Sequence, residues 1–183
     1  MLPKDPYHVR LSGRGGQGIL LAGILVAEAG MKEGYNVVQT QSHGPEARLG
    51  ASRCEVILSN NEIAFPEVEL PDFLLCLSRD AYVKHGRELA DDGLRIVEQQ
   101  VTREEKVNDA LVIPMIEAAR ETGQEIVANV VALGVFIELT GAISEKYLRS
   151  AMEERVKPNY LDMNLKALQK GREIAKKDEV KGG

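Results

Sequence analysis

The chain has 183 residues, of which 44% are hydrophobic and 28% are charged, and its formal net charge is −5 at pH 7. This composition is typical of one globular domain that buries a substantial core. The acidic balance and the aromatic content of 4% argue against a nucleic-acid-binding surface, which needs excess cations or stacking rings.

The distribution of apolar residues and cysteines sets the expected location. The longest apolar run, Ile19–Ala27, is far too short to cross a bilayer, and the first residues show no signal-peptide pattern. Cys54 and Cys76 lie far apart among apolar residues and form no C-x-x-C pair. We therefore expect a cytoplasmic protein with no membrane segment and two buried thiols, and no metal or iron–sulfur cluster held by this chain.

Predicted strands and helices alternate along the chain. Strands are expected over 9–11, 35–40, 51–59, 73–77, 94–97 and 110–113. Helices are expected over 17–32, 79–89, 115–121, 124–139, 144–155 and 160–175. The helices 17–32 and 124–139 are apolar on nearly every face, which predicts burial on several sides. This alternation predicts an α/β protein with a single domain over 1–175, followed by a polar tail over 176–183 that frays.

The segment 51–59 alternates apolar and polar residues, which is typical of an antiparallel strand with one face partly solvated. The turn signal Asn60-Asn61 follows it, so we expect residues 62–65 to form the return strand of a hairpin. Such a hairpin interrupts the βαβ rhythm and predicts a mixed sheet.

A glycine-rich segment, Gly13-Arg14-Gly15-Gly16-Gln17-Gly18, joins the first strand to the first helix. Free N–H groups and the dipole at a helix N-terminus favour an anion. The spacing also fits a dinucleotide fingerprint, but the second strand ends without the acidic residue that binds ribose, and the Lys-Ser/Thr ending of a P-loop is absent. We interpret the segment as a site for a ligand or a closely apposed partner backbone. The alternative is that the glycines only allow the helix to pack on the strand.

A second loop, over 43–50, carries His43, Glu46 and Arg48. In a doubly wound sheet this loop lies at the same edge as the glycine segment, so we expect these side chains to converge with Arg14. Arginine binds phosphate or carboxylate through two donors. The alternative is a solvated surface pair between Glu46 and Arg48.

Asn129 lies inside the apolar stretch 126–137. A buried amide must be hydrogen-bonded, so we expect it to fix a neighbouring loop such as the glycine segment. Direct contact with a ligand is the alternative.

Several segments in this order resemble the gamma subunit of the 2-oxoacid:ferredoxin oxidoreductases, and the resemblance extends from Val9 to about Gly171. The segments that carry it are 13–18, 44–52, 65–66, 72–77, 113–114 and 129–134. The sequence Gly-Pro-Glu-Ala-Arg at 44–48 is similar to the 2-oxoglutarate type. The family usually has Arg-Gly-Gly where this chain has Arg48-Leu49-Gly50, a departure that bears on the geometry of this loop.

The resemblance implies a three-layer α/β/α sandwich with a mixed, mostly parallel sheet. It also implies an enzyme that converts a 2-oxoacid and coenzyme A to an acyl-CoA and carbon dioxide while reducing ferredoxin. Thiamine diphosphate then lies between alpha and beta subunits, and iron–sulfur clusters lie in the beta and, where present, delta subunits. The gamma chain holds none of these alone and is expected to be inactive in isolation.

The expected site consists of Arg14, Gly15, Gly16, Gln17, Gly18, His43, Glu46, Arg48 and Asn129, which face coenzyme A or the partner subunits. Three alternatives stay open: the small subunit of indolepyruvate ferredoxin oxidoreductase, an assembly module without ligand contact, and a stand-alone nucleotide-binding oxidoreductase.

Overall fold

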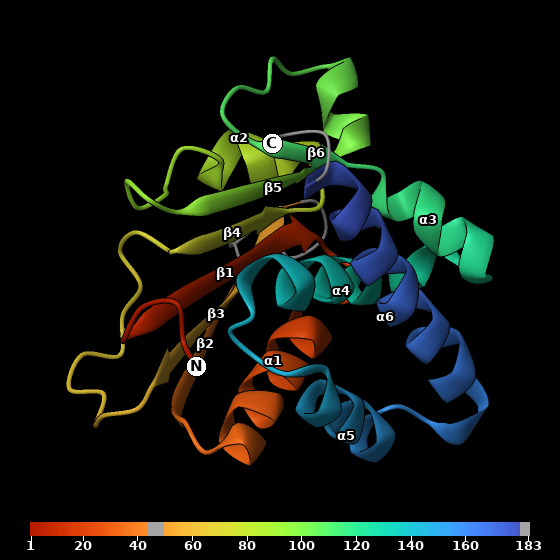
Figure 1. Ribbon diagram of the computed structural model, residues 1–183. Helices are drawn as coiled ribbons and strands as arrows, with labels where there is room; N and C mark the ends of the chain where they lie inside the picture. Colours follow the sequence, from red (N-terminus) through yellow and green to blue (C-terminus); the bar gives the residue numbers. More distant parts are fainter. Residues whose placement is uncertain (44–49, 180–183) are drawn as a thin grey trace.

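The computed structural model describes residues 1–43 and 50–179 (Figure 1). The described strands form one six-stranded sheet in the order β2-β3-β1-β4-β5-β6. Their bounds are β1 (Tyr7–Arg14), β2 (Asn36–His43), β3 (Ala51–Ser59), β4 (Phe73–Cys76), β5 (Leu94–Glu98) and β6 (Leu111–Ile113). The expected loop residues Glu46 and Arg48 lie outside the described ranges.

The sheet is mixed. Strand β1 pairs in parallel with β4, β4 with β5, and β5 with β6, whereas β3 is antiparallel to both β1 and β2. The predicted α/β class with a mixed, mostly parallel sheet is confirmed. The predicted hairpin partner of β3 is wrong: residues 62–65 are not a strand, and β3 pairs instead with the preceding strand β2. The turn signal at 60–61 begins a long irregular connection across 60–72.

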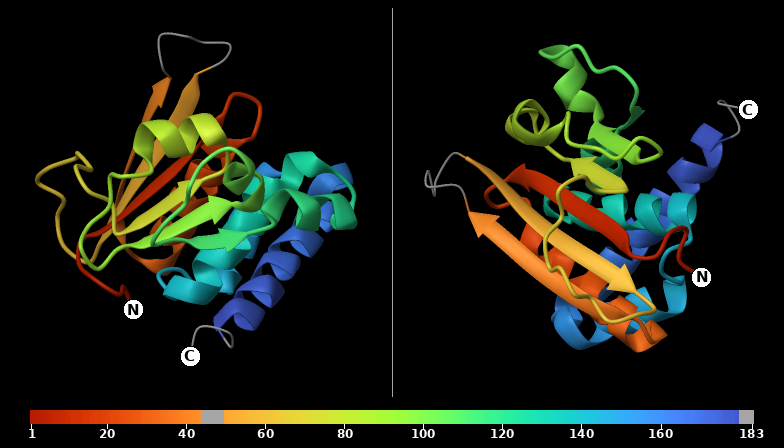
Figure 2. Two further views of the ribbon diagram at one scale, coloured as in Figure 1. Left: turned by 90° about the horizontal axis from the view of Figure 1, so that it is seen from above. Right: turned by 90° about the vertical axis from the view of Figure 1, so that its left-hand side faces the viewer.

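Helices cover the two faces of the sheet unequally (Figure 2). One face carries α1 (Ile19–Glu33), α3 (Met115–Thr122), α4 (Ala128–Thr140), α5 (Glu145–Arg155) and α6 (Pro158–Glu179). The other face carries only α2 (Arg79–His85) and the 3₁₀ turn η1 (Gln99–Arg103), and a second 3₁₀ turn η2 (Glu125–Val127) leads into α4. The last helix runs to Glu179, so the tail expected to fray from 176 begins as helix. None of the described helices is long and apolar enough to span a membrane.

Small residues let the buried helices approach their neighbours. A Cβ on Gly23 of α1 would lie 2.1 Å from the Cys54 sulfur of β3. A Cβ on Gly134 of α4 would lie 2.2 Å from the backbone oxygen of Leu168 in α6. The helices α1 and α4 are therefore apolar on nearly all faces because each lies between the sheet and another helix, as their composition predicts.

A buried arginine organises the sparsely covered face of the sheet. Arg10 of β1 is only 2% exposed, and its Nε donates to Glu55 on β3 at 2.7 Å. Its Nη2 donates to the carbonyl oxygen of Val68 at 2.6 Å, and its Nη1 pairs with Glu88. Arg10 therefore holds the 60–72 connection and the segment after α2 against the sheet, which compensates for burying its charge.

Candidate functional site

The glycine segment forms a tight turn between β1 and α1. Gly16 and Gly18 adopt φ of 86° and 70°, in the left-handed region that L side chains rarely occupy. No atom lies within 4 Å of a Cβ added to Gly15 or Gly16, so the outer side of the turn is open. Arg14, Gly15 and Gly16 are exposed. The turn thus exposes bare backbone at the molecular surface.

Gln17 fixes the turn to the sheet. Its Oε1 accepts from the Arg14 backbone N–H at 2.7 Å, and its Nε2 donates to the carbonyl oxygen of Leu77, just after β4, at 3.1 Å. A Cβ on Gly13 would lie 2.8 Å from this same Oε1. The glutamine side chain therefore holds the turn against the sheet, and the backbone of the turn faces outward.

Within residues 1–43 and 50–179, no side chain caps the N-terminus of α1. Gly18 is the N-cap, so no side chain caps the helix, and its first turn contains no acidic residue. The free N–H groups and the positive end of the dipole then favour an anion.

Asn129, at the start of α4, ties two helix starts together. Its side chain is buried, its Nδ2 donates to the Gly18 carbonyl oxygen at 2.9 Å, and its Oδ1 accepts from the Val130 N–H at 2.9 Å. A Cβ on Gly18 would lie 2.4 Å from this amide nitrogen. The expected role of Asn129 in fixing the glycine segment agrees with this geometry.

The ends of β1, β2 and β3 meet at one edge of the sheet. Arg14 lies opposite Ala51, and His43 lies opposite Ser52 across the other side of β3. The two antiparallel pairings make β2 run in the same direction as β1, although the strands are not neighbours. The structure therefore brings the backbone of His43 to the edge that carries the glycine turn, and the 43–50 loop begins and ends there.

A hollow of about 400 Å³ lies beside Gly18 and Asn129, where helices α1, α4, α5 and α6 meet. Its walls are mostly apolar and include two exposed large side chains, Ile126 (54% exposed) and Tyr160 (51% exposed). Lys157 lies at its rim. Local sequence pattern does not predict this hollow, because its residues come from segments that helical periodicity assigns to the core or to solvent.

Cys76 is a thiol on a strand next to the glycine turn. Cys76, opposite Ser12 at the end of β4, is buried, and burial raises the pKa of its thiol to about 12. It is protonated at neutral pH and cannot act as a nucleophile. Among residues 1–43 and 50–179, no group of three or more His, Cys, Asp or Glu could hold a metal ion.

Comparison with known proteins decides the family. Residues 8–174 match the family model described as Pyruvate ferredoxin/flavodoxin oxidoreductase. The chain belongs to this family. It is 40% identical over 175 residues to the 2-oxoglutarate synthase subunit KorC of Methanocaldococcus jannaschii, covering 92% of this chain and 94% of that subunit.

Solved structures of the family share the fold. The gamma subunit of a keto/oxoacid ferredoxin oxidoreductase from Geobacter sulfurreducens superposes with a TM-score of 0.81 at 38% identity, over 92% of this chain and 98% of that one. The 2-oxoglutarate:ferredoxin oxidoreductase of Magnetococcus marinus contains the same fold, with a TM-score of 0.84 at 24% identity over 94% of this chain and 31% of its own. The predicted resemblance to gamma subunits of 2-oxoacid:ferredoxin oxidoreductases is confirmed.

Proposed function

We propose that this chain is the gamma subunit of a 2-oxoglutarate:ferredoxin oxidoreductase, and that its glycine turn helps to bind coenzyme A. Such an enzyme converts 2-oxoglutarate and coenzyme A to the acyl-CoA and carbon dioxide, and two electrons pass to ferredoxin. The choice of 2-oxoglutarate is supported by the relatives, since KorC is more similar to this chain than the indolepyruvate oxidoreductase subunit IorB of Pyrococcus horikoshii.

In this proposal other subunits hold the reactive cofactors. Thiamine diphosphate belongs to the alpha and beta subunits, and iron–sulfur clusters belong to the beta and delta subunits. The two cysteines of this chain are buried and are not bonded to each other, and they lie on different strands. The chain's own contribution is then to bind and orient, and ferredoxin accepts electrons from the assembled enzyme.

One observation carries the coenzyme A role: the open glycine turn at the uncapped N-terminus of α1. Coenzyme A carries phosphate groups, and a helix N-terminus with free N–H groups stabilises such anions. The exposed Arg14 follows Gly13 in the same turn, and the 43–50 loop with Arg48 starts and ends at this edge. An arginine adds bidentate recognition of phosphate.

The test is steady-state kinetics of the reconstituted complex with Arg14→Ala and Arg48→Ala. Loss of one charge-assisted contact of about 1.5–3 kcal/mol raises the KM for coenzyme A roughly 10- to 100-fold and leaves the KM for 2-oxoglutarate unchanged. The matched control is Arg87→Ala, an exposed arginine beyond α2 that lines neither the turn nor the hollow beside it. An unchanged KM for coenzyme A in both variants, with intact assembly, refutes the role.

An assembly module without ligand contact is a second candidate, favoured by the exposed Ile126 and Tyr160 beside the glycine turn. Exposed apolar side chains around a hollow are typical of protein interfaces. In that case the arginine substitutions change only the amount of complex seen by gel filtration, and the KM for coenzyme A of the remaining complex equals that of the wild type.

A further inference from the structure

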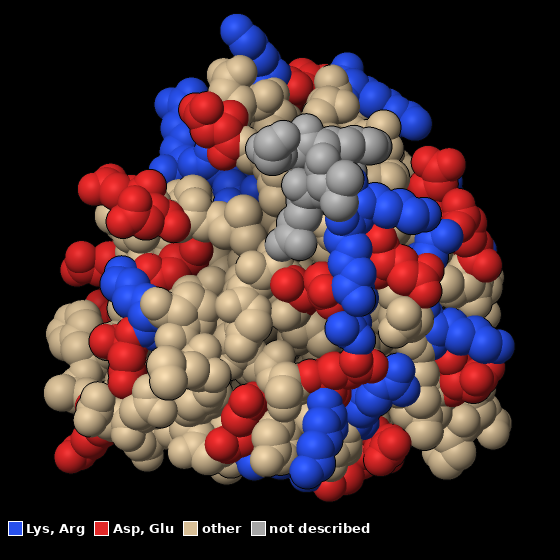
Figure 3. Space-filling model, viewed as in Figure 1, with Lys and Arg blue, Asp and Glu red and all other residues tan. Residues whose placement is uncertain are grey.

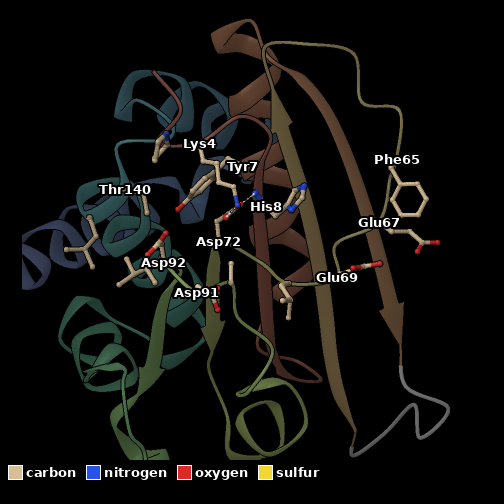
Figure 4. Close-up of a pocket in the computed structure, with 15 residues that line it drawn as sticks. Lys4, Tyr7, His8, Phe65, Glu67, Glu69, Asp72, Asp91, Asp92 and Thr140 are labelled. Atoms are coloured by element: carbon tan, nitrogen blue, oxygen red, sulfur yellow. Dashed lines mark hydrogen bonds and ion pairs between the residues drawn. The ribbon is translucent and has the colours of Figure 1, made fainter.

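A larger hollow lies at the opposite edge of the sheet from the glycine turn, where β1, β4 and β5 begin (Figure 4). Its volume is about 990 Å³. One wall is the 60–72 connection with Phe65 and Glu67, and another is the turn before β5 with Asp91 and Asp92, as Figure 4 shows. The coenzyme A proposal does not use this hollow.

The hollow carries an excess of negative charge. Glu67, Glu69, Asp91 and Asp92 line it, all four are exposed, and none forms an ion pair with any residue that the structure describes. Asp72 differs, because its carboxylate accepts from Lys4 at 2.7 Å and from the His8 backbone N–H at 2.8 Å. Figure 3 shows acidic side chains gathered along the side of the molecule where these two connections lie.

Two large apolar side chains also belong to the lining of this hollow. Phe65 is 65% exposed and Leu70 is 51% exposed, and both line the hollow. An exposed phenylalanine beside unpaired charges is unfavourable in an isolated chain, because removing its ring from water is favourable. The position therefore offers an apolar anchor to a partner.

The connection that displays Phe65 is firmly anchored. Arg10 donates to the Val68 carbonyl oxygen at 2.6 Å, the Val68 side chain is buried, and the Asp72 carboxylate fixes the end of the connection to β1. Connections of this length without regular structure are uncommon in compact domains and usually have a function. The anchoring holds Phe65 outward, where it is available for contact.

We propose that this acidic hollow docks a basic segment of another subunit of the enzyme, whose apolar side chain packs on Phe65 and Leu70. Lysine or arginine side chains of that segment pair with Glu67, Glu69, Asp91 and Asp92, and their aliphatic stems cover apolar surface. The apolar contact supplies most of the affinity, because each exposed ion pair contributes little in water. The carboxylates set the orientation and the association rate. The inference rests on the proposed function, since it requires partner subunits.

Carbodiimide cross-linking of the purified complex tests the contact directly, because it joins a carboxylate to a lysine only where the two touch. We expect peptides that join Glu67, Glu69, Asp91 or Asp92 to a lysine of a different subunit. Cross-links from these carboxylates only to lysines of this chain, within one copy or between two, overturn the proposal.

Charge reversal tests how much these carboxylates contribute to binding of the partner subunits. In the reconstituted complex, Glu67→Lys with Asp91→Lys weakens binding to the partner subunits about tenfold at low salt and flattens its salt dependence. The matched control is Glu117→Lys with Glu153→Lys, two exposed carboxylates on α3 and α5 that form no ion pair with described residues. Its affinity stays within twofold of the wild type. Equal affinities for the two double variants overturn the inference.

Phe65→Ser removes the apolar anchor and leaves the carboxylates in place. We expect this variant to bind the partner subunits more weakly at low and high salt alike. No loss of affinity at either salt concentration overturns the anchor. Wild-type chain that does not assemble with any partner subunit contradicts the proposed function instead, so the two failures are distinguishable.

Discussion

Asn129 is the residue whose removal probes the connection between the glycine turn and the core most sharply. Asn129→Ala deletes two hydrogen bonds: a part-buried one donated to the Gly18 carbonyl oxygen and a buried one accepted from the Val130 N–H. The Gly18 oxygen keeps the helical bond from the Ala22 N–H at 3.0 Å, whereas the Val130 donor loses its side-chain acceptor. A buried donor left unsatisfied costs about 1–3 kcal/mol, and the second lost bond adds about 1 kcal/mol. The free energy of unfolding should fall by about 2–4 kcal/mol.

Urea unfolding followed by circular dichroism measures this difference. Asn164→Ala is the matched control, because Asn164 is also buried but its Nδ2 donates to the Tyr160 carbonyl oxygen four residues earlier in the same helix. That substitution removes one bond within one helix and costs about 0.5–1.5 kcal/mol. An Asn129→Ala variant within 0.5 kcal/mol of the wild type, or equal to the control, refutes the assigned bridging role.

Three further predictions concern the stability of the chain. Arg10→Ala leaves its carboxylate partner on β3 buried without its main counter-charge, so the free energy of unfolding should fall by about 3–5 kcal/mol in urea titrations, and a loss below 1 kcal/mol contradicts the role of this pair. Gly134→Ala forces a methyl group against a backbone oxygen of α6, so thermal unfolding should show a loss of about 1–3 kcal/mol, and an unchanged midpoint argues against the close helix crossing. Burial lowers the pKa of His8 and of His85 below 6.5. Protonation therefore favours the unfolded chain, and the free energy of unfolding decreases as the pH falls from 6.5 through the folded pKa. The His8→Gln/His85→Gln variant should lose less free energy of unfolding than the wild type between pH 7 and about pH 5.5. Parallel pH profiles for the two proteins refute the role of these histidines.

The sequence predicted the parts of the fold that depend on local pattern. The period of apolar residues located the six helices and the main strands, and the continuous apolar runs of α1 and α4 indicated burial on several sides. The amide at Asn129 inside an apolar run indicated a fixed loop, because a buried polar group requires a partner.

Long-range pairing escaped prediction. The alternation in 51–59 is compatible with a return strand on either side, and only tertiary packing selects β2 over residues 62–65. The burial of Arg10 could not be predicted from local pattern, because the carboxylate of Glu55 and the carbonyl oxygen of Val68 that bind it come from distant segments. The acidic hollow also combines segments far apart in the chain.

We expect this subunit to be needed for the coenzyme A-dependent reaction of the whole enzyme. Reconstitution of the other subunits with and without this chain tests it most directly, by following reduction of ferredoxin with 2-oxoglutarate as coenzyme A is titrated. Omission of the chain should abolish coenzyme A-dependent reduction of ferredoxin, and adding the purified chain should restore it. Equal rates and an equal KM for coenzyme A without the chain would show that the other subunits bind coenzyme A and react without it.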